Sequence, residues 1–173
     1  MLLQVEDYEK YGLDPTDKTL PAKLEAIEHS IRKHTNNRFH VRARRVEAVS
    51  SRGILLGVPP GVKAGDTVQI TASCVNDGLY TVQTAGTKNL TLDRPLLDAK
   101  FNRCTLVCYP PDVVAGAVGI LEHERSMKGK QNIASESLSR RSVTYVQQNK
   151  ENTLAGYPLA VTGFLGPYMR ARF

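Results

Sequence analysis

The residues suited to catalysis or metal binding are few in this sequence, and they are scattered. Its histidines are His29, His34, His40 and His123. On a helix the first two point about 140° apart around the axis, too far apart to share a ligand easily. His123 lies between Glu122 and Glu124 but lacks the second histidine of an H-E-x-x-H zinc motif. If the protein were an enzyme, His123 with Glu122 or Glu124 would be its catalytic pair. We keep an enzymatic function only as an alternative.

The three cysteines are Cys74, Cys104 and Cys108. An odd number argues against a disulfide framework. Cys104 and Cys108 are four positions apart in a predicted strand, so we expect both on one face. They are either half of a metal site or small buried apolar side chains, and the second interpretation is favoured.

Nucleophile and phosphate-binding motifs are lacking as well. The sequence holds no G-x-S-x-G, P-loop or G-x-G-x-x-G pattern. The stretch Gly57-Val58-Pro59-Pro60-Gly61 is rich in glycine, but its prolines remove the amide donors that a phosphate needs. The sequence therefore predicts no enzyme, no cofactor and no metal site.

The charge of the chain is uneven. The net charge is +6, and carboxylates outnumber lysines in the first 25 residues. Basic residues follow that could line a DNA channel or a subunit interface: Arg32, Lys33, Arg38, Arg42, Arg44, Arg45, Arg140 and Arg141. A solvated basic face is the alternative, and no helix-turn-helix, zinc-finger or RNA-recognition signature accompanies these residues. Any nucleic acid contact is therefore expected to be non-specific.

The C-terminal residues combine apolar anchors with cations. The candidate docking residues are Phe164, Leu165, Pro167, Tyr168, Met169, Arg170, Arg172 and Phe173. Tyr, Met and Arg are enriched at interface cores, and a short segment can fold on a partner. The alternative is a tail that packs on its own domain.

Helical patterns begin and end the sequence. We expect a short helix from Leu3 to Tyr11, and a second from Leu20 to Asn36 with Thr19 as N-cap. A third is predicted from Asp112 to about Met127, and a short last one from Leu154 to Leu165.

Between the second and third predicted helices, apolar residues recur every second position, as they do in strands. Five or six short strands separated by Gly, Pro and Asn predict a small antiparallel barrel or sandwich. The predicted fold is α+β, a small bundle of three to four helices interrupted by this inserted β module. The helical body covers 1–40 and 109–173, the β module 41–108, and a docking tail 166–173.

The order of these parts resembles the head–tail connector (adaptor, or head-completion) proteins of long-tailed bacteriophages, in the branch with a β-rich insertion. Three stretches carry the resemblance: Ala26 to Phe39, Gly65 to Val113 with its Tyr109-Pro110-Pro111 re-entry, and Ser135 to Tyr145 followed by Phe164 to Phe173. Leu138-Ser139-Arg140-Arg141 departs from the glycine and acidic residue common in relatives.

The resemblance implies a structural virion protein rather than an enzyme. It implies a homo-oligomeric ring of about twelve subunits that docks under the portal protein at the capsid vertex. Such a ring extends the DNA channel, contacts genomic DNA non-specifically and carries the stopper or tail-completion protein. The alternatives are a tail-completion or stopper protein of the same neck region, or a non-specific DNA-binding accessory protein.

Location follows from the same arguments. No apolar run approaches the roughly 20 residues that span a bilayer, and the N-terminal residues lack a signal-peptide pattern. The expected location is the head–tail junction of the virion, after synthesis in the host cytoplasm, with no membrane partner.

Overall fold

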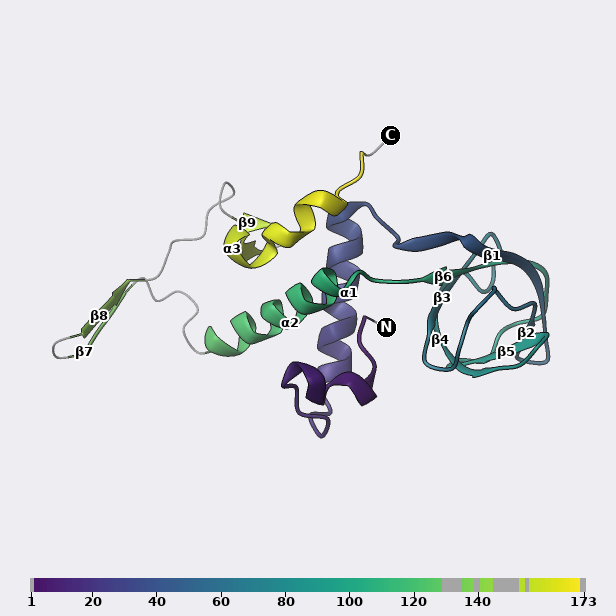
Figure 1. The fold of residues 1–173 in the computed structure, drawn as a ribbon, viewed down its shortest axis with the longest axis horizontal. Helices are drawn as coiled ribbons and strands as arrows, with labels where there is room; N and C mark the ends of the chain where they lie inside the picture. The colour runs from purple at the N-terminus through teal and green to yellow at the C-terminus, as the bar shows by residue number, and fades with distance from the viewer. Residues whose placement is uncertain (1, 129–134, 139–140, 145–152, 155, 172–173) are drawn as a thin grey trace. The chain divides into compact units, whose positions relative to one another are not determined.

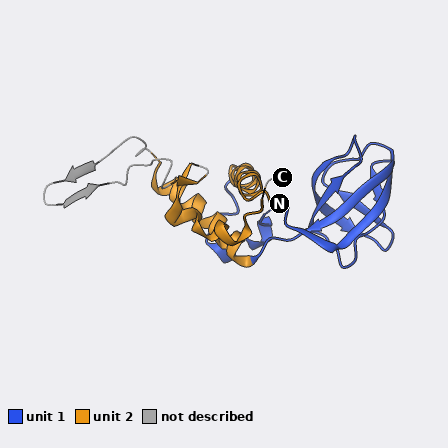
Figure 2. Ribbon diagram, turned by 90° about the horizontal axis from the view of Figure 1, so that it is seen from above, with its two compact units in different colours: residues 1–18, 37–110 blue, residues 19–36, 111–173 orange. Residues whose placement is uncertain are grey.

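The computed structural model describes residues 2–128, 135–138, 141–144, 153–154 and 156–171. The chain divides into two compact units, and we describe each by itself (Figure 2). Unit 1 comprises residues 1–18 and 37–110, and unit 2 comprises residues 19–36 and 111–173.

A closed antiparallel β-barrel forms most of unit 1 (Figure 1). Its strands follow each other around the barrel in the order β1-β2-β5-β4-β3-β6. They are β1 (His40–Ser51), β2 (Ile54–Leu56), β3 (Thr67–Thr71), β4 (Gly78–Ala85), β5 (Asn89–Leu92) and β6 (Ala99–Val107). Closure pairs β1 with β6, so no strand edge of this sheet is left open.

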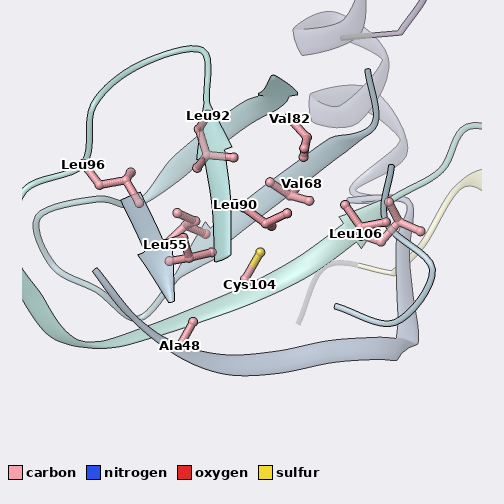
Figure 3. Packing of buried hydrophobic residues seen from close by; sticks show 11 residues of the cluster. Ala48, Leu55, Val68, Val82, Leu90, Leu92, Leu96, Cys104 and Leu106 are labelled. Carbon is pink, nitrogen blue, oxygen red and sulfur yellow. The ribbon is translucent and has the colours of Figure 1, made fainter. Parts of the chain in front are cut away.

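Aliphatic side chains from every strand fill the barrel (Figure 3). Val68, Ile70, Leu55 and Leu90 are completely excluded from solvent. They alternate with more exposed neighbours along each strand, as the two-residue period of a half-buried strand requires. Each buried side chain of this size contributes about 1.5–3 kcal/mol to folding.

The long strand β1 departs from regular pairing with β6 at two points. His40 pairs with Val107 and Arg45 with Thr105, so four residues of β1 lie opposite Leu106 alone. Nearer its end, one residue of β1 lies opposite two residues of β6. Such bulges bend a strand and increase its twist, which helps a short sheet to close.

Unit 2 contains two helices of 16 residues, α1 (Leu20–Thr35) and α2 (Pro111–Ser126). In α1 the buried residues Leu20, Leu24, Ile27 and Ile31 form the stripe that the sequence predicts. Pro21 lies in its first turn, and Asn36 ends it in the left-handed conformation, with φ of 48°. Thr19 occupies the N-cap position but its side chain makes no capping hydrogen bond.

The prediction of a three- to four-helix bundle interrupted by a β insertion is wrong. The described chain is a mixed α+β fold with a closed six-stranded barrel, and α3 (Leu159–Thr162) joins α1 and α2 as its only other α-helix. α3 has four residues, little more than one turn. Two helices and one turn do not make a bundle, and the barrel is the most extensively paired body.

Both expected terminal helices break down for local reasons. Residues predicted as the first helix form two single 3-10 turns, η1 (Val5–Asp7) and η2 (Glu9–Tyr11), before Gly12. The last predicted helix is divided into β9 (Thr153–Leu154), β10 (Tyr157–Pro158), α3 and the 3-10 segment η3 (Gly163–Tyr168). Gly156 has φ of 86°, a conformation that interrupts any helix there.

A hairpin also forms between the second and third helices: β7 (Ser135–Leu138) pairs with β8 (Arg141–Thr144).

Candidate partner-binding surfaces

The C-terminal segment is anchored on α2 by two adjacent apolar side chains. Leu165 is 1% exposed, and it lines a small apolar cavity together with Ile31 and Ile120. The ring of Phe164 lies against Gly116, where a Cβ would come within 2.3 Å of its Cε1. Gly116 therefore provides the space that the ring occupies. At this point α2 admits an aromatic side chain at its surface.

A polar contact continues this anchorage at the end of η3. The hydroxyl of Tyr168 lies 2.8 Å from both carboxylate oxygens of Asp112, in the first turn of α2. The hydrogen bond to Asp112 raises the pKa of Tyr168, because the carboxylate favours the protonated phenol.

Beyond Tyr168 the backbone becomes extended and meets the end of α1. The N–H of Arg170 donates to the carbonyl of Thr35 at 2.8 Å. A second hydrogen bond follows, in which Asn36 Nδ2 donates to the carbonyl of Ala171 at 2.8 Å. The last carbonyls of a helix lack partners within the helix, so the C-terminal segment satisfies one of them from outside.

These contacts divide the predicted docking residues into two groups. Phe164, Leu165 and Tyr168 are engaged within unit 2. Pro167, Met169 and Arg170 have exposed side chains, with Met169 48% exposed. Arg172 and Phe173 lie outside the described residues. We define the exposed terminal stretch as Met169, Arg170 and Ala171.

The partners of this segment were not predicted from the sequence. Gly116 gave a signal, because a glycine inside a helix costs about 1 kcal/mol and indicates close packing. For Asp112 the sequence indicates only the start of a helix. Nothing in the sequence indicated that Thr35 and Asn36 would receive the C-terminal backbone.

The predicted basic residues fall at different places in the fold. Arg32 and Lys33 lie in the last turn of α1, where cations interact favourably with the helix dipole. Arg38 is exposed just before β1. Arg140 lies outside the described residues, and Arg141 begins β8.

Three of the predicted cations lie at the first bulge of β1. Arg42, Arg44 and Arg45 are all exposed. The guanidinium of Arg44 lies beside Gly61, within 3.4 Å of where a Cβ would stand. Arg45 Nε donates to Thr105 Oγ1 at 3.3 Å. We name this group the basic bulge.

The cysteines do not share a face, so that expectation is wrong. Cys104 lies in the barrel core, and burial raises the pKa of its thiol to about 12. Cys108 is exposed because β6 ends at Val107 and the alternation of the strand stops there. Within the described part of the chain, no three metal-binding side chains gather into a site.

A buried polar network centred on Asn76 was also missed. Asn76 is buried and hydrogen-bonds Ser50 and Asn102 at 3.0 and 3.2 Å. Asn102 Nδ2 donates to Ser50 Oγ at 3.1 Å and closes the triangle. In the loop that carries Asn76, Ala72 and Cys74 have positive φ.

Comparison with known proteins finds no family model that matches the chain and no curated protein that matches it in sequence. In the described residues, no helix is long and apolar enough to cross a bilayer.

Proposed function

We propose that this protein is a subunit of the head–tail connector (adaptor) ring of a long-tailed bacteriophage. In this role it docks under the portal protein and extends the DNA channel. Its other side provides a platform for the stopper or tail-completion protein. The proposal begins from the sequence resemblance, and the observation that carries it is the exposed terminal stretch following an anchored segment.

The anchorage prepares this stretch for binding. Leu165 and Phe164 fix the segment on α2, and Tyr168 ties it to Asp112. Met169 and Arg170 follow with their side chains in solvent. A pre-positioned segment loses less conformational entropy on binding than a free tail. Met and Arg are also residue types enriched in interface cores.

The basic bulge supports the channel part of the proposal. Arg42, Arg44 and Arg45 expose their side chains without any accompanying base-reading motif. Exposed cations of this kind attract phosphates through counterion release and are insensitive to sequence. Such contacts suit a channel through which DNA must slide.

The test measures whether the chain binds the portal protein of the same virus. Copurification detects the complex, and electron microscopy shows where the chain lies in it. Met169→Asp combined with Arg170→Glu changes the exposed terminal stretch and leaves its anchors intact. We expect this variant to lose portal binding. Lys128→Glu is the control, because Lys128 is an exposed cation outside the stretch. Wild-type binding by both variants would contradict the docking role. Microscopy also distinguishes a ring next to the portal from a stopper or tail-completion protein farther along the neck.

A non-specific DNA-binding accessory protein is the second candidate, and the basic bulge is the observation that favours it. It predicts tight binding of duplex DNA by the isolated chain, with log affinity falling by about 0.9 per contacted phosphate for each unit of log salt. Arg42→Gln with Arg44→Gln should reduce that slope. Arg94→Gln is the matched control, because Arg94 already contacts Tyr80 and the carbonyl of Leu79.

A further inference from the structure

The barrel has two chemically different ends. The chain enters at His40 and leaves at Val107, and these residues pair with each other. The opposite, distal end is formed by the β1–β2 turn, the β3–β4 loop (72–77) and the β5–β6 connection (93–98). The basic bulge lies toward the first end, near the entry of β1.

Two large apolar side chains project from the distal end. Val75 is 54% exposed and Leu97 is 64% exposed, and they lie in two different loops. We define Val75 and Leu97 as the apolar tip. Exposed side chains of this size are common singly, but two on adjoining loops of one barrel end form a candidate contact.

The apolar tip is held rigidly from beneath. Asn76 Nδ2 donates to the carbonyl of Leu97 at 2.8 Å, and Asn76 Oδ1 accepts the N–H of Leu97 at 2.9 Å. Ser50 Oγ donates to the same carbonyl at 2.7 Å. Buried, satisfied networks of this kind fix backbone position, so little entropy is lost when the tip binds.

A second apolar area lies on the outer wall of the same barrel. Val49 of β1 pairs with Leu56 of β2 on the outward face. At the second bulge Val49 lies opposite Lys100 and Phe101 of β6. Val49, Leu56 and Phe101 are all exposed, and they lie on three adjacent strands. We define these three residues as the apolar wall.

The charges around the two areas differ in sign. The distal loops expose two cations and three carboxylates, which are Arg52, Arg94, Asp77, Asp93 and Asp98. The apolar wall is bordered by Lys100 opposite Val49, by Lys88 next to the Leu56–Asn89 pair, and by Arg103, whose guanidinium lies 5.8 Å from the centre of the Phe101 ring. Glu47, opposite Arg103, is the carboxylate beside these cations. The whole chain carries +6, so two copies repel each other in general. The tip, with an excess of carboxylates, can approach the wall, with an excess of cations, without that repulsion.

We propose that the apolar tip of one barrel packs against the apolar wall of the barrel in a second copy of this chain. A cyclic ring needs two different, complementary surfaces on every subunit. The tip and the wall supply two such surfaces, each apolar, with surrounding charges of opposite sign. This inference rests on the proposed ring, because it names one contact between its subunits.

The native cysteines allow a direct test by oxidative cross-linking. Cys74 is exposed beside Val75 at the tip, whereas Cys104 is buried in the core. A Cys108→Ser background removes the exposed thiol at the other end of β6. Adding Leu56→Cys then places one thiol on the tip and one on the wall. We expect a ladder of disulfide-linked multimers, because each subunit joins two neighbours. Leu159→Cys in the same background is the control at another exposed leucine, and we expect no ladder from it.

Two results of the cross-linking overturn the inference. Linked dimers from Cys74 alone would indicate tip-to-tip contact, and absence of any Leu56→Cys ladder would show that tip and wall do not meet.

Sedimentation provides an independent measurement: Leu97→Asp should weaken self-association by about tenfold or more, whereas Leu159→Asp should not. Equal association of Leu97→Asp and wild type also overturns it. Portal binding is measured separately. If the chain forms the ladder but does not bind the portal, the connector role is contradicted and the contact between tip and wall is supported.

Discussion

The side-chain amide of Asn76 pairs with the backbone of Leu97 as a neighbouring strand would. It accepts the N–H of Leu97 at 2.9 Å and donates to its carbonyl at 2.8 Å. One side chain thereby satisfies both polar groups of a peptide segment that joins β5 to β6. The loops at this end of the barrel behave as part of the sheet rather than as free connections.

Replacing Asn76 should therefore destabilise the barrel. Asn76→Ala leaves the Leu97 N–H without its partner and deprives the buried Asn102 and Ser50 of a neighbour. Each unsatisfied buried group costs about 1–3 kcal/mol, so we expect a loss of at least that size in urea unfolding. Gln83→Ala, at an exposed position of β4, should change stability by less than about 0.5 kcal/mol. Similar values for the two variants would contradict the structural role of the network.

The two glycines inside α2 should respond in opposite directions to alanine. At Gly116 a Cβ would come within 2.3 Å of the Phe164 ring, so Gly116→Ala should displace the C-terminal segment and lower stability. At Gly119 nothing lies within 4 Å, so Gly119→Ala should raise stability by up to about 1 kcal/mol through helix propensity. Thermal unfolding of both variants makes the comparison. Adding Phe164→Leu should recover part of the Gly116→Ala loss, and its failure to do so would remove Phe164 as the cause.

The anchorage of the C-terminal segment should depend on Leu165 far more than on Met169. Leu165→Ala opens a cavity at a fully buried site and should cost about 2–5 kcal/mol. Met169→Ala truncates a half-exposed side chain and should cost little. Hydrogen exchange at the amide of Arg170, which is bonded to Thr35, reports whether the segment has detached. Unchanged exchange in Leu165→Ala would contradict this anchorage.

The thiols should differ in reactivity and give the barrel an alkaline limit. Cys74 and Cys108 are exposed and should react at once with a thiol reagent, whereas Cys104 should react only on unfolding. Burial raises the pKa of Cys104 from 9.0 to about 12. Between these values the unfolded chain releases a proton that the folded chain keeps. The free energy of unfolding should therefore fall as the pH rises above about 9.

Cys104→Ala isolates this effect from the titration of the tyrosines. Urea unfolding at pH 8 and at about pH 10.5 should show a smaller decline for the variant than for wild type. Equal declines, or three rapidly reacting thiols in the folded protein, would contradict the burial of Cys104.

Local pattern determined how well each element could be predicted. The apolar stripe of α1 lies entirely within its own residues, so the sequence places this helix correctly. The C-terminal segment was not placed correctly, because its conformation depends on Gly116 and Thr35, which lie far from it in sequence. Cys108 was assigned to a face that exists only while the strand continues. The Asn76 network forms because the β3–β4 loop meets Ser50 of β1 and Asn102 of β6, and no periodicity encodes a contact between segments so distant in sequence.

Phe164 and Leu165 illustrate the limit of interpreting site residues by composition. An apolar and basic segment has the same appearance whether it anchors a fold or binds a partner. Burial separates the two uses: among the described residues of this segment, the exposed side chains of Pro167, Met169 and Arg170 can serve the second.

The pairing of His40 with Val107 has a consequence for the modularity of this protein. Partners in an antiparallel pair stand about 5 Å apart, so a segment of nearly 70 residues begins and ends at almost the same point. A host chain needs only two neighbouring backbone positions to carry such a segment. The barrel segment can therefore be replaced by a short linker, or inserted into a loop of another protein, without moving the two chain ends apart.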